Sequence, residues 1–155
     1  MDFLNYLLVS IAAFSGLWIG AILSFISPEE MKPGKKYFMW MIKILFMVLV
    51  LLIAIFLGGE KFLVSLVFIL FCTAFIIYVR QKFIYPVLGL LFYFSAKDAV
   101  LFPIAASLIF IIGLPKGSIF AFEHKGVKKD RILKKMFFCH ALFLIIALPL
   151  YFSNL

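Results

Sequence analysis

"AAFSGLWIGAILS", residues 12–24, is a bulky apolar run in which a small residue recurs at every fourth position. In an α-helix this spacing places Ala12, Gly16, Gly20 and Ser24 on one face, one above the other. Membrane helices associate through close backbone approach, and small residues at this spacing permit it. The stretch therefore predicts a membrane-spanning helix with a packing face. Its partner is either another helix of this chain or a second copy, which would make a homo-oligomer through the first span.

The composition excludes a soluble domain. Of the 155 residues, 66% are hydrophobic and 14% are charged, whereas soluble domains have about 45–50% apolar and about 25% charged residues. A soluble globule of this size has too little interior for these side chains, which include 21 Phe. We therefore expect an all-α fold, a polytopic transmembrane helical bundle that forms a single integral membrane domain over residues 1–155.

The apolar segments divide the chain into six spans. A span needs about 20 helical residues, and four segments meet that length: 3–26, 37–58, 62–79 and 136–153. The stretch 83–114 is too long for one crossing and is interrupted by "SAKDA" at 95–99, so we divide it into short spans at 83–95 and 96–114. A re-entrant hairpin over 83–114 is the alternative. A basic interfacial loop, 115–135, precedes the sixth span.

The basic residues predict which connections face the cytoplasm. The connection after the first span contains Lys32, Lys35 and Lys36, and the loop 115–135 contains seven Lys and Arg residues. Cytoplasmic loops of membrane proteins carry such an excess of Lys and Arg. Six spans, with both termini outside the cell membrane, place every basic connection in the cytoplasm. A re-entrant hairpin keeps the same arrangement, whereas a single crossing over 83–114 does not.

The net charge of +8 points to lipid rather than to nucleic acid. Nucleic-acid binding needs a basic face on a water-soluble module, but here the basic residues lie between spans. Anionic lipid head groups are the expected partner, because they attract basic residues next to a membrane. In 115–135 apolar clusters alternate with bases, as in segments that lie on a membrane surface. The candidate head-group ligands are Lys125, Lys128, Lys129, Arg131, Lys134 and Lys135.

Asp98 has two possible roles. Ser95 and Asp98 have the S-x-x-D spacing of a helix start, so Asp98 can cap the fifth span beside Lys97 at the outer surface. If 83–114 is re-entrant, Asp98 lies inside the bilayer, where acids and helix ends form ion or substrate sites. The candidate pathway residues are Asp98, Lys97, Ser95, Pro103, Ser107, Lys43 and His140, with the last two near the cytoplasmic interface.

A capped surface turn is expected between the first two spans. In "SPEEMKPG", residues 27–34, Ser27 and Glu30 have the spacing of a capping box, and Pro33 and Gly34 are expected to end the turn. This interpretation is favoured over a catalytic pair formed by Glu29 and Glu30.

The motifs of several enzyme and channel classes are missing from the sequence. It contains no HExxH, GxSxG, Walker loop or TVGYG-type filter. We therefore expect no catalytic residues, metal or cofactor. The leading hypothesis is a channel or transporter for an ion or small solute that works as an oligomer. The alternative is a non-catalytic scaffold or subunit that binds partner helices and anionic lipid, and a lipid-modifying enzyme is the third hypothesis.

Overall fold

Every secondary-structure element is a helix in residues 2–58 and 84–152, the part of the chain that the structure, a computed structural model, describes. The helices are α1 (Phe3–Ile26), α2 (Met31–Gly58), α4 (Ile84–Ser95), α5 (Leu101–Glu123), α6 (Lys129–His140) and α7 (Leu142–Phe152). The span expected at 62–79 lies outside the described residues. The expected all-α fold is confirmed.

Within the described residues, three helices are long and apolar enough to cross a bilayer. α1 has 24 residues, α2 has 28 and α5 has 23, and at about 1.5 Å per residue each exceeds the roughly 30 Å of a hydrocarbon core. The bundle also exposes large apolar side chains on its outside, including Ile11, Trp18, Ile22 and Ile44. A hydrocarbon environment accounts for apolar residues on both faces of these helices. The chain is therefore a helical membrane protein.

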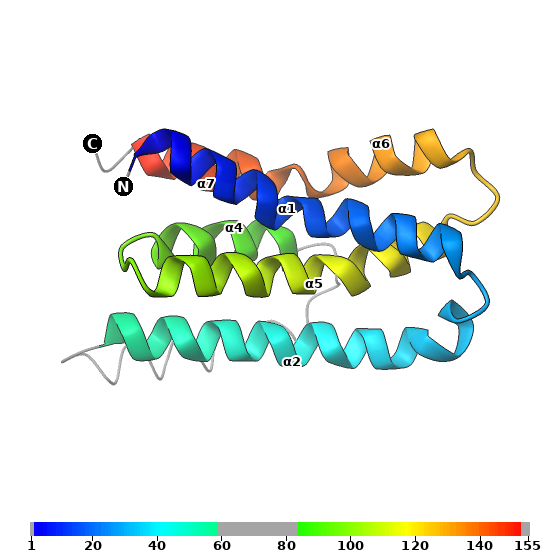
Figure 1. Cartoon of the computed structure of the whole chain (residues 1–155), viewed down its shortest axis with the longest axis horizontal. Coiled ribbons are helices and arrows are strands. Elements are labelled where there is room, and N and C mark those ends of the chain that lie inside the picture. Colours follow the sequence, from blue (N-terminus) through cyan, green and yellow to red (C-terminus); the bar gives the residue numbers. More distant parts are fainter. Residues whose placement is uncertain (1, 59–83, 153–155) are drawn as a thin grey trace.

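α5 is the central helix of the bundle. It lies between α1 and α2 and packs against both (Figure 1). α4 and α7 pack together at the end that carries both termini, whereas the turns after α1 and α5 lie at the opposite end (Figure 1). The two turns thus share one end of the bundle, as the distribution of basic residues requires. Fully buried side chains from several helices fill the interior, among them Tyr6, Leu17, Phe92, Ile109 and Phe143.

The connection between α1 and α2 is shorter than the sequence predicts. The Ser27 N–H donates a hydrogen bond to the Leu23 carbonyl oxygen at 3.0 Å and ends α1, and α2 begins at Met31 rather than at 37. Pro33 and Gly34, which we expected to end a separate turn, lie in the first turns of α2. Proline is tolerated there because the first N–H groups of a helix have no intrahelical acceptor.

The connection after α5 is also shorter than predicted. α5 begins at Leu101 rather than at 96, continues through Pro115 and ends at Glu123, so the basic loop expected at 115–135 is reduced to residues 124–128. A proline inside a helix removes one backbone hydrogen bond, here the one to the Ile111 carbonyl. The fifth helix continues because its residues on both sides of Pro115 pack tightly against α1.

The region of the last predicted span contains two helices joined at a bend. α6 and α7 meet at Ala141 with an angle of 42° between them. On α6, Ile132, Met136 and His140 recur at four-residue spacing and are buried, whereas the bases between them are exposed. This pattern makes α6 amphipathic. The span expected at 136–153 therefore starts within α6, and the bend falls inside it.

Candidate functional site

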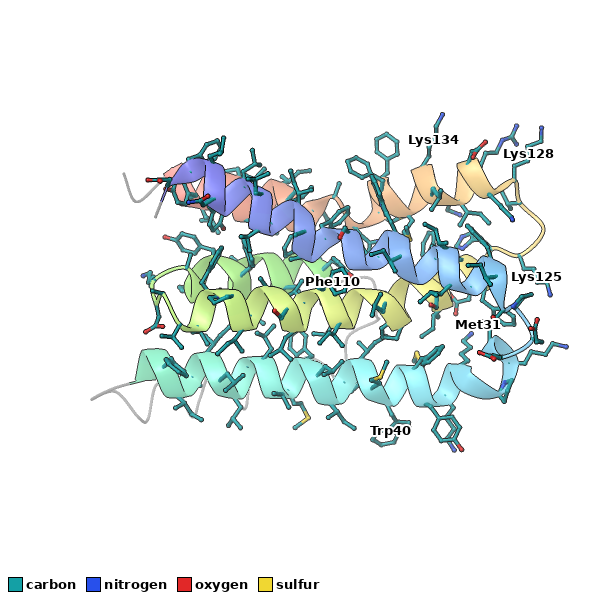
Figure 2. The ribbon with its side chains drawn as sticks, in the orientation of Figure 1. Met31, Trp40, Phe110, Lys125, Lys128 and Lys134 are labelled. Carbon is teal, nitrogen blue, oxygen red and sulfur yellow. The ribbon has the colours of Figure 1, made fainter. Side chains whose placement is uncertain are left out.

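The glycine face of α1 packs against α5 of the same chain. A Cβ atom at Gly16 would overlap the carbonyl oxygen of Phe110, and one at Gly20 would overlap the carbonyl oxygen of Leu114. Figure 2 labels Phe110 at this crossing of the two helices. The backbones of α1 and α5 are thus in direct contact, and no side chain fits between them at these two positions.

Sequence reasoning missed the matching glycines of α5. A Cβ atom at Gly113 would lie 2.8 Å from the carbonyl carbon of Gly16, and one at Gly117 would overlap the carbonyl oxygen of Leu17. The stretch "GLPKG" on α5 has the same spacing as "GLWIG" on α1. That spacing is the signal that could have identified the partner helix.

A hydrogen bond reinforces the same contact. The Ser118 hydroxyl of α5 donates to the Gly20 carbonyl oxygen of α1 at 2.7 Å. Ser24 is buried further along α1, whereas Ala12 is exposed. Self-association through the first span stays a prediction, and it would have to use a surface other than Gly16 and Gly20, which α5 covers.

Pro103 and Ser107 lie with Ala12 in a groove of about 460 Å³ between α1 and α5. The hydroxyl groups in this groove bond within their own helices, Ser15 to the Ala12 carbonyl at 2.7 Å and Ser107 to the Pro103 carbonyl at 2.9 Å. The remaining lining is apolar. A groove of this chemistry suits a hydrocarbon chain better than a hydrated ion.

Asp98 caps α5. One carboxylate oxygen, Oδ1, accepts hydrogen bonds from the N–H groups of Val100 and Leu101, each at 2.8 Å. Asp98 is half-buried and Lys97 is exposed, with the Lys97 ammonium 5.7 Å from the Phe94 ring centroid. The geometry is that of the helix cap predicted as the first of the two roles. It lies in the turn between α4 and α5, at the end of the bundle that carries the termini (Figure 1).

Ser95 does not take part in the cap. It is the last residue of α4, and its buried hydroxyl donates to the Phe92 carbonyl oxygen at 2.7 Å. The S-x-x-D spacing therefore marks the end of one helix and the cap of the next, rather than a capping box.

The buried polar side chains that stand out are Lys116 and His140, which are 6% and 4% exposed. Lys116 lies within electrostatic range of His140 and of Glu123. The His140 ring contacts Tyr85 edge to face, with centroids 4.7 Å apart, and the ring of Phe120 at 5.5 Å. Lys116, His140 and Tyr85, from α5, α6 and α4, are called the polar cluster below.

A hydrogen bond places a proton on Nδ1 of His140. This nitrogen lies 2.8 Å from the Met136 carbonyl oxygen, which only an N–H can satisfy, so in the neutral form of the ring Nε2 is the acceptor. The Tyr85 side chain is 1% exposed, and its hydroxyl has no hydrogen-bond partner among the described residues. The polar cluster thus holds a buried phenol that can still donate a hydrogen bond.

Two helix irregularities lie beside the polar cluster. Pro115 precedes Lys116, and the bend between α6 and α7 follows His140. The α6–α7 bend lies near the middle of the bundle (Figure 1). Interrupted helices at membrane depth expose backbone groups that bind ions and substrates in transporters. The arrangement therefore offers a polar site inside an apolar bundle.

Lys43, a candidate pathway residue, does not lie with His140 in the polar cluster. The Lys43 ammonium lies over the Trp40 ring of its own helix, 5.7 Å from the centroid, and α2 lies on the other side of α5 from α6 and α7 (Figure 1). Sequence reasoning also missed Lys116, which it assigned to the basic loop, and Tyr85, which belongs to none of the motifs considered. No local pattern marks either residue as buried beside a histidine.

The candidate lipid ligands gather at the end of the bundle opposite the termini. Lys125, Lys128 and Lys134 project from it (Figure 2), and Lys129 and Arg131 are also exposed. The Lys135 ammonium lies 2.9 Å from Nε2 of His124. Figure 2 places Met31, at the start of α2, at this same end.

The described residues contain no cluster of three or more His, Cys, Asp or Glu side chains that could hold a metal ion. Comparison of the chain with family models, curated proteins and solved structures gives no match.

Proposed function

We propose that this membrane protein is a channel or transporter for an ion or a small solute, and that its path passes the polar cluster. The observation that carries the proposal is the burial of Lys116 and His140 inside an apolar bundle, beside a buried Tyr85 hydroxyl. Ionisable side chains are costly inside a membrane and are found there mainly where they serve transport or binding.

The helix irregularities support the same site. Pro115 removes one backbone hydrogen bond within α5, and the bend at Ala141 separates α6 from α7. Such irregularities are typical of substrate sites in many secondary transporters. A bundle of this size encloses little space of its own, so we propose an oligomer as the working unit. By the positive-inside rule, the basic end faces the cytoplasm and the termini face outward.

Asp98 is not placed on the path in this proposal. Its carboxylate is engaged by two backbone N–H groups at the end of the bundle, which accounts for it as a cap. The groove that contains Pro103 and Ser107 is apolar and is assigned to lipid contact instead.

The test is flux through vesicles that contain the purified protein. Lys116→Met keeps the length of the side chain and removes its charge, and His140→Gln keeps a hydrogen-bonding group but cannot titrate. Flux of protons, monovalent cations and monovalent anions is followed with indicator dyes. Whichever flux the wild type shows, we expect both variants to reduce it to the level of protein-free vesicles.

The matched control is Asp98→Asn, which removes a charge outside the polar cluster and is expected to retain the flux. A Lys116→Met variant that folds, judged by gel filtration and circular dichroism, and that transports like the wild type would contradict the proposal. Tyr85→Phe removes one hydroxyl only, so it keeps the test valid if the other variants fail to fold. A wild type with no flux of any of these ions or of small neutral solutes also contradicts it.

A further inference from the structure

A second site lies at the basic end of the bundle and is independent of the proposed transport path. A pocket of about 200 Å³ opens between the turn after α1, the end of α5 and the start of α6. Its lining includes Phe25, Phe122, Val127 and Ile132, together with Lys125 and Lys129. The pocket therefore combines apolar walls with two ammonium groups.

The two lysines lie against aromatic rings of the pocket. The Lys129 ammonium is 5.4 Å from the Phe25 ring centroid, and the Lys125 ammonium is 6.0 Å from that of Phe122. Such cation–π contacts attract an ammonium group and limit its motion. The lysines are thus held at the pocket from two different elements, the 124–128 turn and α6.

The turn that carries Lys125 requires a glycine. Gly126 has φ +106°, in the left-handed region that glycine occupies without steric cost. This conformation joins α5 to α6 within residues 124–128. As a result Lys125 and Lys129, four residues apart, line the same pocket although they do not belong to one helix.

The acids nearby do not neutralise these lysines. Glu123 is paired with Lys35, whose ammonium lies 2.8 Å from its Oε1 atom. No ion pair of Lys125 or Lys129 is seen with any acid in residues 2–58 and 84–152. The pocket therefore presents positive charge to a ligand.

From these observations we infer that the pocket binds the phosphate head group of an anionic phospholipid. Lys125 and Lys129 contact the phosphate oxygens, and the rings of Phe25 and Phe122 lie along the glycerol and the first acyl carbons. The apolar lining favours an amphiphile over a free phosphate ion, because apart from the two lysines the pocket offers one polar side chain, that of Ser24. The position beside the other basic residues of this end agrees with a head-group depth.

The experiment titrates the purified full-length protein in a non-ionic detergent with phosphatidylglycerol, phosphatidylcholine or inorganic phosphate. Native mass spectrometry counts bound lipid, and calorimetry follows phosphate. The pocket variant is Lys125→Gln with Lys129→Gln. The control is Lys32→Gln with Lys36→Gln, which removes the same charge from exposed residues at the same end of the bundle, outside the pocket.

We expect the pocket variant to bind phosphatidylglycerol at least about tenfold more weakly than the control variant does, and phosphatidylcholine to be unaffected. A basic residue near a membrane surface contributes a factor of about five by charge alone, so charge without a pocket weakens both variants equally. An equal loss in the two variants would overturn the inference. Binding of inorganic phosphate as tight as that of phosphatidylglycerol would overturn it as well, because the site would then serve a free phosphate compound.

Discussion

The Ser118 hydroxyl on α5 donates a hydrogen bond to the Gly20 carbonyl oxygen on α1, with 2.7 Å between the oxygens. This bond is possible because the two helices have no side chain between them at Gly20. Membrane helices gain little from hydrophobic burial against each other, since lipid is equally apolar, so close packing and interhelical hydrogen bonds hold them together. We therefore expect the contact between α1 and α5 to contribute strongly to the stability of the bundle.

The first prediction concerns the glycine contact. Gly20→Ala places a methyl group against the Leu114 backbone, which cannot move aside as a side chain can. We expect the free energy of unfolding to fall by about 1–3 kcal/mol or more, because 1–3 kcal/mol is roughly the usual cost of overpacking. The measurement is unfolding in detergent followed by circular dichroism.

Gly34→Ala is the matched control for this prediction. A Cβ atom at Gly34 would meet the Phe38 ring at 3.7 Å, an ordinary contact distance, and alanine also favours a helix. We expect this variant to be as stable as the wild type or slightly more so. Equal stability of Gly20→Ala and the wild type would show that α1 and α5 are not in backbone contact.

The second prediction isolates the hydrogen bond. Ser118→Ala removes the bond to Gly20 but leaves the backbone contact, and we expect a loss of about 0.6 kcal/mol and no more than about 1.7 kcal/mol, the range for such bonds in membranes. Ser107→Ala is the control, because the Ser107 hydroxyl bonds only within its own helix. If thermal unfolding shows the same change for both variants, Ser118 has no special role between the helices.

The third prediction separates capping from transport at Asp98. Asp98→Ala removes the acceptor for the Val100 and Leu101 N–H groups, and we expect a loss of about 1 kcal/mol, the typical value for a lost N-cap. Asp98→Asn keeps a capping oxygen and should cost much less. Thermal unfolding of both variants measures the difference, and an equally large loss in Asp98→Asn would assign the effect to the charge rather than to the cap.

The fourth prediction is that replacing Tyr85 lowers transport activity without lowering stability. Its buried hydroxyl has no partner among the described residues, and a buried group left unpaired costs about 1–3 kcal/mol. Tyr85→Phe should therefore unfold at the same or a higher temperature than the wild type while it reduces flux in vesicles. A lower unfolding temperature would mean that the hydroxyl stabilises the fold.

The sequence is sufficient to predict α1 and the helical membrane class, because a long apolar run can only be buried in lipid as a helix. It also predicts the packing face, since Gly16 and Gly20 share a side of the helix whatever lies opposite. Four-residue spacing does not identify the partner helix, however. The structure identifies it as α5, because Gly113 and Gly117 of that helix contact the backbone of α1.

The polar cluster could not be predicted, for two physical reasons. Pro115 and Gly117 flank Lys116 and are typical of a loop, yet contact with α1 keeps the segment helical and carries the lysine into the interior. Tyr85 contacts His140 only through tertiary packing, because the two residues are 55 positions apart in the sequence, from 85 to 140. Asp98 was predictable as a cap because capping is a local interaction.

The most direct test of the account asks on which side of the membrane the two ends of the bundle lie. With Cys72 and Cys139 replaced by serine, single cysteines are introduced by Lys32→Cys, Lys128→Cys, Asp2→Cys and Ala99→Cys, and intact cells are treated with a membrane-impermeant maleimide before and after permeabilisation. We predict that positions 2 and 99 react in intact cells, and that positions 32 and 128 react only after permeabilisation. Labelling of positions 32 and 128 from opposite sides of the membrane would contradict the account.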